Sequence, residues 1–131
     1  MYAIVVGIDD SEERATAQAR ELLGMPMDPA DVRVTVVHAF QENPAGASVA
    51  QVGSVRRFVD LLEDEGFEVE LQEAGSDPAP AITAVADEVD ADLIVLAGRK
   101  RTPTGKVLFG SVTQAVILDT SRAVLVCRTD A

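Results

Sequence analysis

Cysteine and histidine each occur only once in this sequence of 131 residues. The single cysteine, Cys127, excludes a disulfide within the chain, and its place in an apolar run predicts a small buried side chain. The single histidine, His38, excludes a histidine-rich metal site, and we expect it to pack or hydrogen-bond locally at a strand end. No apolar run approaches the ~20 residues that a membrane-spanning helix needs.

Positive charge is also scarce. Eleven Lys and Arg stand against 22 Asp and Glu, which gives a formal net charge of −11 and a pI near 4.3. Such a surface repels nucleic acid and anionic membranes, so neither is an expected partner. The first residues lack the basic segment of a signal peptide, and we therefore expect a cytoplasmic protein.

Apolar runs alternate along the chain with stretches of helical periodicity. Five strands are predicted, at residues 2–8, 32–40, 67–71, 93–97 and 123–128, with 67–71 at a sheet edge because its charged and apolar residues alternate. Four helices are predicted, at about residues 11–23, 48–65, 81–90 and 111–118. Strict alternation of strands and helices predicts a doubly wound parallel α/β sheet, formed by one domain over residues 1–131.

A cationic loop follows the fourth predicted strand. Gly98 leads into Arg99, Lys100 and Arg101, Lys106 follows, and no acidic residue occurs between Leu93 and Leu118. The loop ends where Ser111 and Gln114 have the spacing of a capping box, which predicts a helix start. The first turn of a helix attracts anions, so this segment is a candidate phosphate site. Alternatively, it is a solvated loop that balances the acidic surface.

The first predicted strand ends in a polar turn, Asp9-Asp10-Ser11. Ligands of doubly wound sheets lie beyond the carboxyl ends of the strands, where the strand order reverses. If the first and fourth strands are neighbours there, the Asp9 turn and the cationic loop face one crevice. Alternatively, Asp9 only caps the first helix, and Ser111 is an N-cap in either case.

Three features together resemble the universal stress protein family over almost the whole chain: the Asp9-Asp10-Ser11 turn, His38 at the end of the second strand, and the Gly-Ser-Val-Thr sequence at 110–113. The resemblance implies an adenine-nucleotide-alpha-hydrolase-like fold with strand order 3-2-1-4-5. It also implies binding of ATP, with Mg²⁺ or Mn²⁺ as the accompanying cation. Family members dimerise through the last strand, so a homodimer through residues 123–128 is expected.

The resemblance also assigns roles to individual residues. Asp9 matches an aspartate that contacts the adenosine moiety, and Ala39 falls where a small residue lines the adenine pocket. Ala97 and Gly98 border the ribose and phosphates, and the phosphates are bound by Gly110, Ser111, Val112 and Thr113. The charge pattern adds Arg99, Lys100, Arg101 and Lys106 as sources of attraction for the phosphates. No catalytic and no metal-ligating residue is predicted.

The glycine motif of the nucleotide-binding members is incomplete here, because Arg101 occupies the position of its second glycine and the interval from Gly98 to Gly110 is one residue short. Two functions therefore stay open. One is an ATP-binding regulatory module with little or no hydrolysis; the other is a nucleotide-free dimeric interaction module. An enzyme of the related hydrolases is a weaker third, since residues 7–11 lack their Ser-Gly-Gly-x-Asp-Ser sequence. The client protein is not identified by the sequence.

Overall fold

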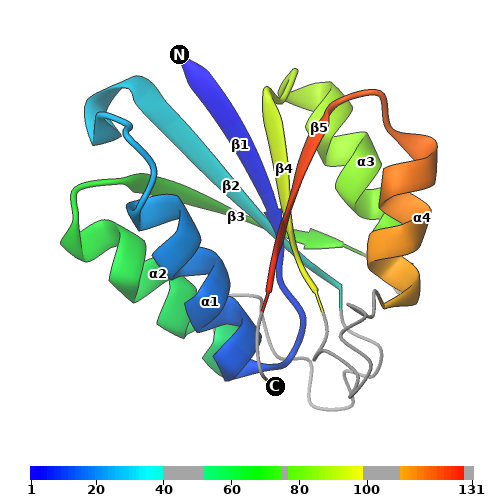
Figure 1. Ribbon diagram of the computed structural model, residues 1–131, viewed down its shortest axis with the longest axis horizontal. Helices are drawn as coiled ribbons and strands as arrows, with labels where there is room; N and C mark the ends of the chain where they lie inside the picture. The colour runs from blue at the N-terminus through cyan, green and yellow to red at the C-terminus, as the bar shows by residue number, and fades with distance from the viewer. Residues whose placement is uncertain (40–51, 75–76, 99–109, 129–131) are drawn as a thin grey trace.

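The computed structural model describes residues 1–39, 52–74, 77–98 and 110–128, which form a three-layer α/β structure (Figure 1). The middle layer is a parallel sheet with the strand order β3-β2-β1-β4-β5. The order and the parallel pairing confirm the predicted doubly wound fold. The strands are β1 (Tyr2–Gly7), β2 (Val32–Ala39), β3 (Glu68–Ala74), β4 (Leu93–Ala97) and β5 (Ala123–Cys127).

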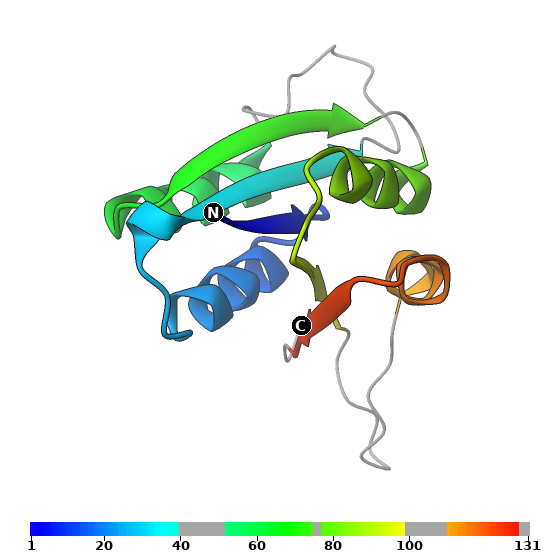
Figure 2. The same ribbon diagram turned by 90° about the horizontal axis from the view of Figure 1, so that it is seen from above.

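Two helices cover each face of this sheet in the described part of the chain (Figures 1 and 2). On one face lie α1 (Glu12–Leu23) and α2 (Gly53–Asp64); on the other lie α3 (Pro78–Glu88) and α4 (Ser111–Asp119). A short 3₁₀ turn, Pro29–Asp31, precedes β2. Among the helices described, none combines the length and the apolar character needed to cross a bilayer.

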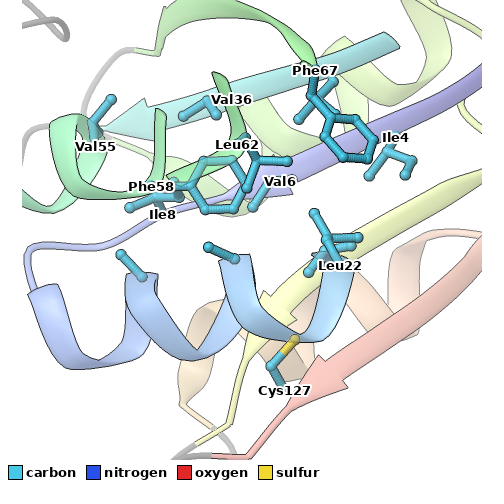
Figure 3. Packing of buried hydrophobic residues seen from close by; sticks show 14 of the residues in the cluster. Ile4, Val6, Ile8, Leu22, Val36, Val55, Phe58, Leu62, Phe67 and Cys127 are labelled. Carbon is cyan, nitrogen blue, oxygen red and sulfur yellow. The ribbon is translucent and has the colours of Figure 1, made fainter. Parts of the chain in front are cut away.

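The central strands are buried on both faces, so alternate residues enter two separate apolar clusters. Ile4 and Val6 pack with α1 and α2, whereas Val5 packs with α3. Phe58 and Leu62 of α2 reach into the first of these clusters (Figure 3). Because Phe58 is fully buried, Phe58→Ala should lower the free energy of unfolding by about 3–5 kcal/mol.

The sheet has β3 and β5 at its two edges. The edge position of β3 was predicted from its alternating pattern and is confirmed, with Glu68 and Glu70 exposed. Cys127, the last residue of β5, is 1 % exposed, so the predicted burial of the lone cysteine is also confirmed. The outer edge of β5 has no partner strand among the described residues.

Several predicted boundaries were wrong. The helix predicted from residue 48 begins at Gly53, with Val52 as its N-cap, and residues 48–51 lie outside the described part. The strand predicted at 67–71 runs on to Ala74 because its pairing with β2 continues to that residue. The helix predicted from about residue 81 already begins at Pro78, since proline fits the first turn of a helix, where its missing N–H leaves no bond unmade.

The strand order reverses between β1 and β4, which are neighbours as the family resemblance implied. The helices that follow them, α1 and α4, lie on opposite faces of the sheet, and both begin at the carboxyl ends of the strands (Figure 1). The chain therefore leaves β1 toward one face of the sheet and leaves β4 toward the other face. That is where doubly wound proteins bind ligands.

Candidate functional site

A cavity of about 280 Å³ opens at the carboxyl ends of β1 and β4. Ligand pockets usually measure about 300–1,000 Å³, so this cavity is close to the lower end of that range. Residues of β1, α1, β2, α3, β4 and α4, which are far apart in the sequence, contribute to it. Its lining consists of Gly7, Ile8, Asp9, Asp10, Arg14, Val37, His38, Pro78, Ile82, Leu96, Ala97, Gly110, Ser111, Val112 and Thr113.

Asp9 lies in the turn between β1 and α1, and both of its carboxylate oxygens are engaged. Oδ1 accepts a hydrogen bond of 2.9 Å from the backbone N–H of Ser11, and Oδ2 accepts one of 2.7 Å from Nε of Arg14. Ser11, not Asp9, caps α1, because its hydroxyl accepts from the N–H of Arg14. Asp9 keeps an ordered carboxylate at the cavity, since its side chain is still 47 % exposed.

Arg14 adds a positive charge to the cavity wall that the sequence did not lead us to expect. Its side chain is 19 % exposed and forms an ion pair with Asp9. Of the described lining residues it alone carries a permanent positive charge, and it stands beside the carboxylate of Asp9. A ligand at this wall therefore meets a guanidinium and a carboxylate side by side.

The opposite wall is the beginning of α4. Gly110 is the N-cap, with no side-chain hydrogen bond to the first turn, and its carbonyl accepts from the N–H of Gln114. The prediction that Ser111 caps this helix was wrong, because Gly110 already accepts the first intrahelical bond and Ser111 is the first helical residue. The backbone N–H groups of a first turn have no partner within the helix, so they are donors suited to an anion.

Thr113 ties α4 to β4. Its side chain is 5 % exposed, and its hydroxyl donates a hydrogen bond of 3.1 Å to the carbonyl oxygen of Ala97, the last residue of β4. Gly98 follows, is buried, and donates its N–H to the carbonyl oxygen of Cys127 at 2.8 Å. The bond from Thr113 holds the start of α4 against the end of β4, and the bond from Gly98 joins that end to β5.

An apolar surface separates the two polar walls. Val37 and Leu96 are buried strand residues, and together with Ile82 of α3 they line the cavity. Gly7 permits the close approach of Ile82, since a Cβ atom there would lie 2.6 Å from Cδ1 of that side chain. A planar apolar group such as a nucleobase matches this surface, because burying it removes apolar area from water.

The structure brings six of the twelve predicted site residues together at the cavity: Asp9, Ala97, Gly110, Ser111, Val112 and Thr113. Ala39 ends β2 directly after His38, which lines the cavity, whereas Gly98 is not part of the lining. Arg99 and Arg101, with the rest of the cationic loop at 99–109, lie outside the described residues.

Sequence reasoning missed Arg14, Val37, Pro78, Ile82 and Leu96. The sequence could have indicated Arg14, because it stands five residues after Asp9 and therefore in the first turn of the helix that follows. His38 was expected to pack or hydrogen-bond locally; it is buried, but its Nδ1 lies 2.7 Å from the carbonyl oxygen of Ile8, which is 30 residues away in the sequence. Its Nε2 lies 3.4 Å from Oδ1 of Asp10.

A second hollow, of about 730 Å³, follows the outer side of α1. Its lining is mostly charged, with Glu12, Glu13, Arg20 and Glu21 from α1 and Arg128 from beyond β5. The carboxylates of Glu12, Glu13 and Glu21 repel phosphate, so this hollow offers less to a nucleotide. Within the described part of the chain, no group of three or more His, Cys, Asp or Glu side chains could hold a metal ion.

The strand order and the cavity at its reversal define an α/β protein of the nucleotide-alpha-hydrolase-like type. The chain belongs to the universal stress protein family, because the model of that family matches residues 1–128. This confirms the resemblance seen in the sequence. A universal stress protein of Mycolicibacterium smegmatis is 36% identical over 80 residues, which span 60% of this chain and 62% of that protein.

Solved structures of the same family share the fold over nearly the whole chain. A universal stress protein in complex with cAMP has 26% sequence identity and a TM-score of 0.70, covering 98% of this chain and 97% of its own. The universal stress protein of Archaeoglobus fulgidus in complex with dAMP has 27% identity and a TM-score of 0.64, covering 97% of this chain and 98% of its own.

Proposed function

We propose that this protein is a regulatory module that binds an adenine nucleotide, ATP in particular, at the carboxyl ends of β1 and β4. The observation that carries the proposal is that the Asp9 turn and the N-terminus of α4 line one cavity. The similar proteins solved with cAMP and dAMP support the choice of base, since both ligands contain adenine.

Each wall of the cavity suits one part of such a ligand. The apolar surface of Val37, Ile82 and Leu96 takes the adenine ring, and Asp9 contacts the adenosine moiety. The phosphates lie at the first turn of α4, where backbone N–H groups and the helix dipole stabilise negative charge. The same proposal keeps Ala39 beside the adenine, and Ala97 and Gly98 beside the ribose and phosphates. Arg99 and Arg101 attract the phosphates.

The proposal includes little or no hydrolysis. A general base must be placed to take a proton from water, and here the carboxylate of Asp9 is assigned to the adenosine moiety instead. The pair Gly105-Lys106 does not belong to a P-loop, because Val107 stands where a Ser or Thr binds the cation. Mg²⁺ or Mn²⁺ would enter with the phosphates of ATP and would screen their charge.

Calorimetric titration of the purified protein with ATP, AMP and cAMP, with GTP as the control, tests this function. We expect binding of the adenine nucleotides and weaker binding of GTP, together with phosphate release from ATP no faster than in buffer. Absence of binding of all three adenine nucleotides at millimolar concentration would contradict the proposal. It would favour the nucleotide-free interaction module, which Arg101 and the shortened Gly98–Gly110 interval support.

We further propose a homodimer formed through residues 123–128. β5 is an edge strand with partly exposed Val124, Leu125 and Val126, and such an edge pairs readily with a second strand. Val126→Asp should yield monomers in light scattering because it places a charge at the paired edge. Leu71→Asp on β3, the opposite edge, is the matched control and should leave the dimer intact; a dimeric Val126→Asp protein would contradict this interface.

A further inference from the structure

Three consecutive backbone carbonyls at the end of β1 each accept a hydrogen bond from a buried side chain. Nε2 of Gln18 donates to Gly7 at 2.9 Å, Nδ1 of His38 lies 2.7 Å from the oxygen of Ile8, and Oγ of Ser54 donates to Asp9 at 2.5 Å. The donors come from α1, β2 and α2, and each is at most 1 % exposed.

The direction of these bonds follows from the acceptors. A backbone carbonyl oxygen can only accept, so the amide NH₂ of Gln18 must face Gly7, and Nδ1 of His38 must carry the proton. The other ring nitrogen of His38, Nε2, lies 3.4 Å from Oδ1 of Asp10. All three side chains therefore act as donors toward one short stretch of backbone.

The end of the strand makes such donors necessary. Up to Gly7 the backbone of β1 is paired with β2, and the last backbone bond runs from the N–H of Ile8 to the carbonyl oxygen of Val37. Beyond it the chain leaves the sheet while still packed under α1 and α2. Buried carbonyls without partners are rare in folded proteins because they are costly, and here side chains from distant elements replace the sheet.

We propose that Gln18, His38 and Ser54 are positioning residues of the nucleotide site, which fix the backbone of the turn that carries Asp9 before a ligand arrives. The inference rests on the proposed function. Ser54 holds the carbonyl of Asp9 itself, while Ser11 and Arg14 hold its carboxylate. A turn ordered in advance loses less conformational entropy on binding, and the ligand is bound more tightly.

Ser54 and Gln18 give the cleanest tests, because neither lines the cavity, whereas His38 does. Ser54→Ala and Gln18→Met remove one donor each with little change of volume. Thr35→Val is the matched control: Thr35 lies in β2, is 1 % exposed, and its hydroxyl has no hydrogen-bond partner among the described residues. For His38, the Asn variant keeps a donor near the place of Nδ1 and the Leu variant does not.

The affinity for AMP should fall about fivefold in Ser54→Ala and in Gln18→Met, the size expected for one lost hydrogen bond, and stay unchanged in Thr35→Val. His38→Asn should retain more affinity than His38→Leu. Wild-type affinity in folded Ser54→Ala and Gln18→Met proteins would overturn the inference. So would an equal loss in Thr35→Val, since that would show a general response of the core.

Amide hydrogen exchange of the ligand-free protein separates this inference from the proposed function. Exchange at Asp10 and Ser11 should become faster in Ser54→Ala, relative to the N–H of Val95 in β4, and should not change in Thr35→Val. Unaltered exchange at the turn would overturn the positioning role even if nucleotides bind. Failure of the wild-type protein to bind any adenine nucleotide would contradict the proposed function while the exchange result still decides whether these donors order the turn.

Discussion

The two walls of the cavity are built in different ways. The turn after β1 has its carbonyls bound by side chains from three elements and its carboxylate bound by Ser11 and Arg14. The start of α4 has a glycine cap with no side-chain bond, and among the described residues the hydroxyl of Thr113 ties it to β4. The backbone and the Asp9 carboxylate of one wall, here called the saturated wall, are held by internal hydrogen bonds, and the other wall keeps backbone donors for a ligand.

Because of this difference, we expect the two walls to bind different parts of a ligand. The saturated wall holds its groups in a fixed orientation and is suited to recognising shape and hydroxyl groups. The wall at α4 presents N–H groups whose best partner is an anion from outside the protein. Substitutions on the β1 side should therefore alter recognition strongly, and substitutions on the α4 side should act mainly through the junction of α4 with β4.

The largest effect is expected from Asp9→Ala, which removes the only group of the saturated wall proposed to contact the adenosine moiety. A hydrogen bond to a charged group contributes about 1.5–3 kcal/mol, so the affinity for AMP should fall about 10- to 100-fold in calorimetry. Asp64→Ala removes a carboxylate from the far end of α2 and should not change the affinity. Equal affinities of the two variants would contradict the role of Asp9.

Arg14→Ala should have the next largest effect, about three- to tenfold weaker binding of AMP, because Asp9 loses the partner of Oδ2. Thermal stability should change little, since ion pairs at the surface contribute about 0–1 kcal/mol. Arg20→Ala, on the outer side of the same helix, is the control. In the double variant of Asp9 and Arg14 the losses should not add, because the two residues act as one unit. Additive losses would argue for separate contacts with the ligand.

Thr113→Val tests the other wall. The substitution keeps the shape but leaves the carbonyl of Ala97 without its donor, so the free energy of unfolding should fall by about 1–3 kcal/mol. The affinity for AMP should weaken only about two- to threefold, less than for the substitutions on the β1 side. This is because only a small part of the lost free energy of unfolding should appear as lost binding free energy. Thr113→Ser keeps the hydroxyl and should resemble the wild type. A loss of affinity larger than that of Arg14→Ala would reverse the expected difference between the two walls.

The smallest effect on the affinity for AMP is expected at Cys127, which does not line the cavity. Its carbonyl accepts a hydrogen bond from the N–H of Gly98 beside the α4 wall. Burial, with a lesser contribution from the charge of Glu21, raises the pKa of its thiol from 9.0 to about 12. The unfolded chain therefore ionises first, so the contribution of this thiol to stability is complete below about pH 9 and is lost as the pH rises toward 12. Denaturation in urea between these values should show a steeper decline for the wild type than for Cys127→Ala. Parallel declines would contradict the assignment.

The sequence predicted the architecture because the pattern of apolar runs is local. The buried strands and the edge at β3 follow from such runs and from the rules for parallel sheets. The neighbouring positions of β1 and β4 were implied by the family resemblance. Six of the predicted residues meet at one cavity, since each stands at a strand end or at a helix start.

What the sequence could not predict depends on contacts between distant residues. Ser54 and His38 bind carbonyls 45 and 30 residues away, and no periodic pattern distinguishes them from other buried residues. The cap of α4 was misplaced by one residue, because the spacing of Ser111 and Gln114 fits a capping box while Gly110 accepts the first bond of the helix. The cationic loop lies outside the described residues, so its role stays a prediction.

The most direct test of the account is a titration of the labelled protein with AMP, followed by backbone amide NMR. The amide signals of Asp9, Ser111 and Val37 should shift together with a single affinity, while those of Thr16 and Arg20 on the outer side of α1 stay in place. Shifts at α1's outer side without shifts at Asp9 and Ser111, or different affinities for Asp9 and Ser111, would contradict the claim that both walls enclose one nucleotide.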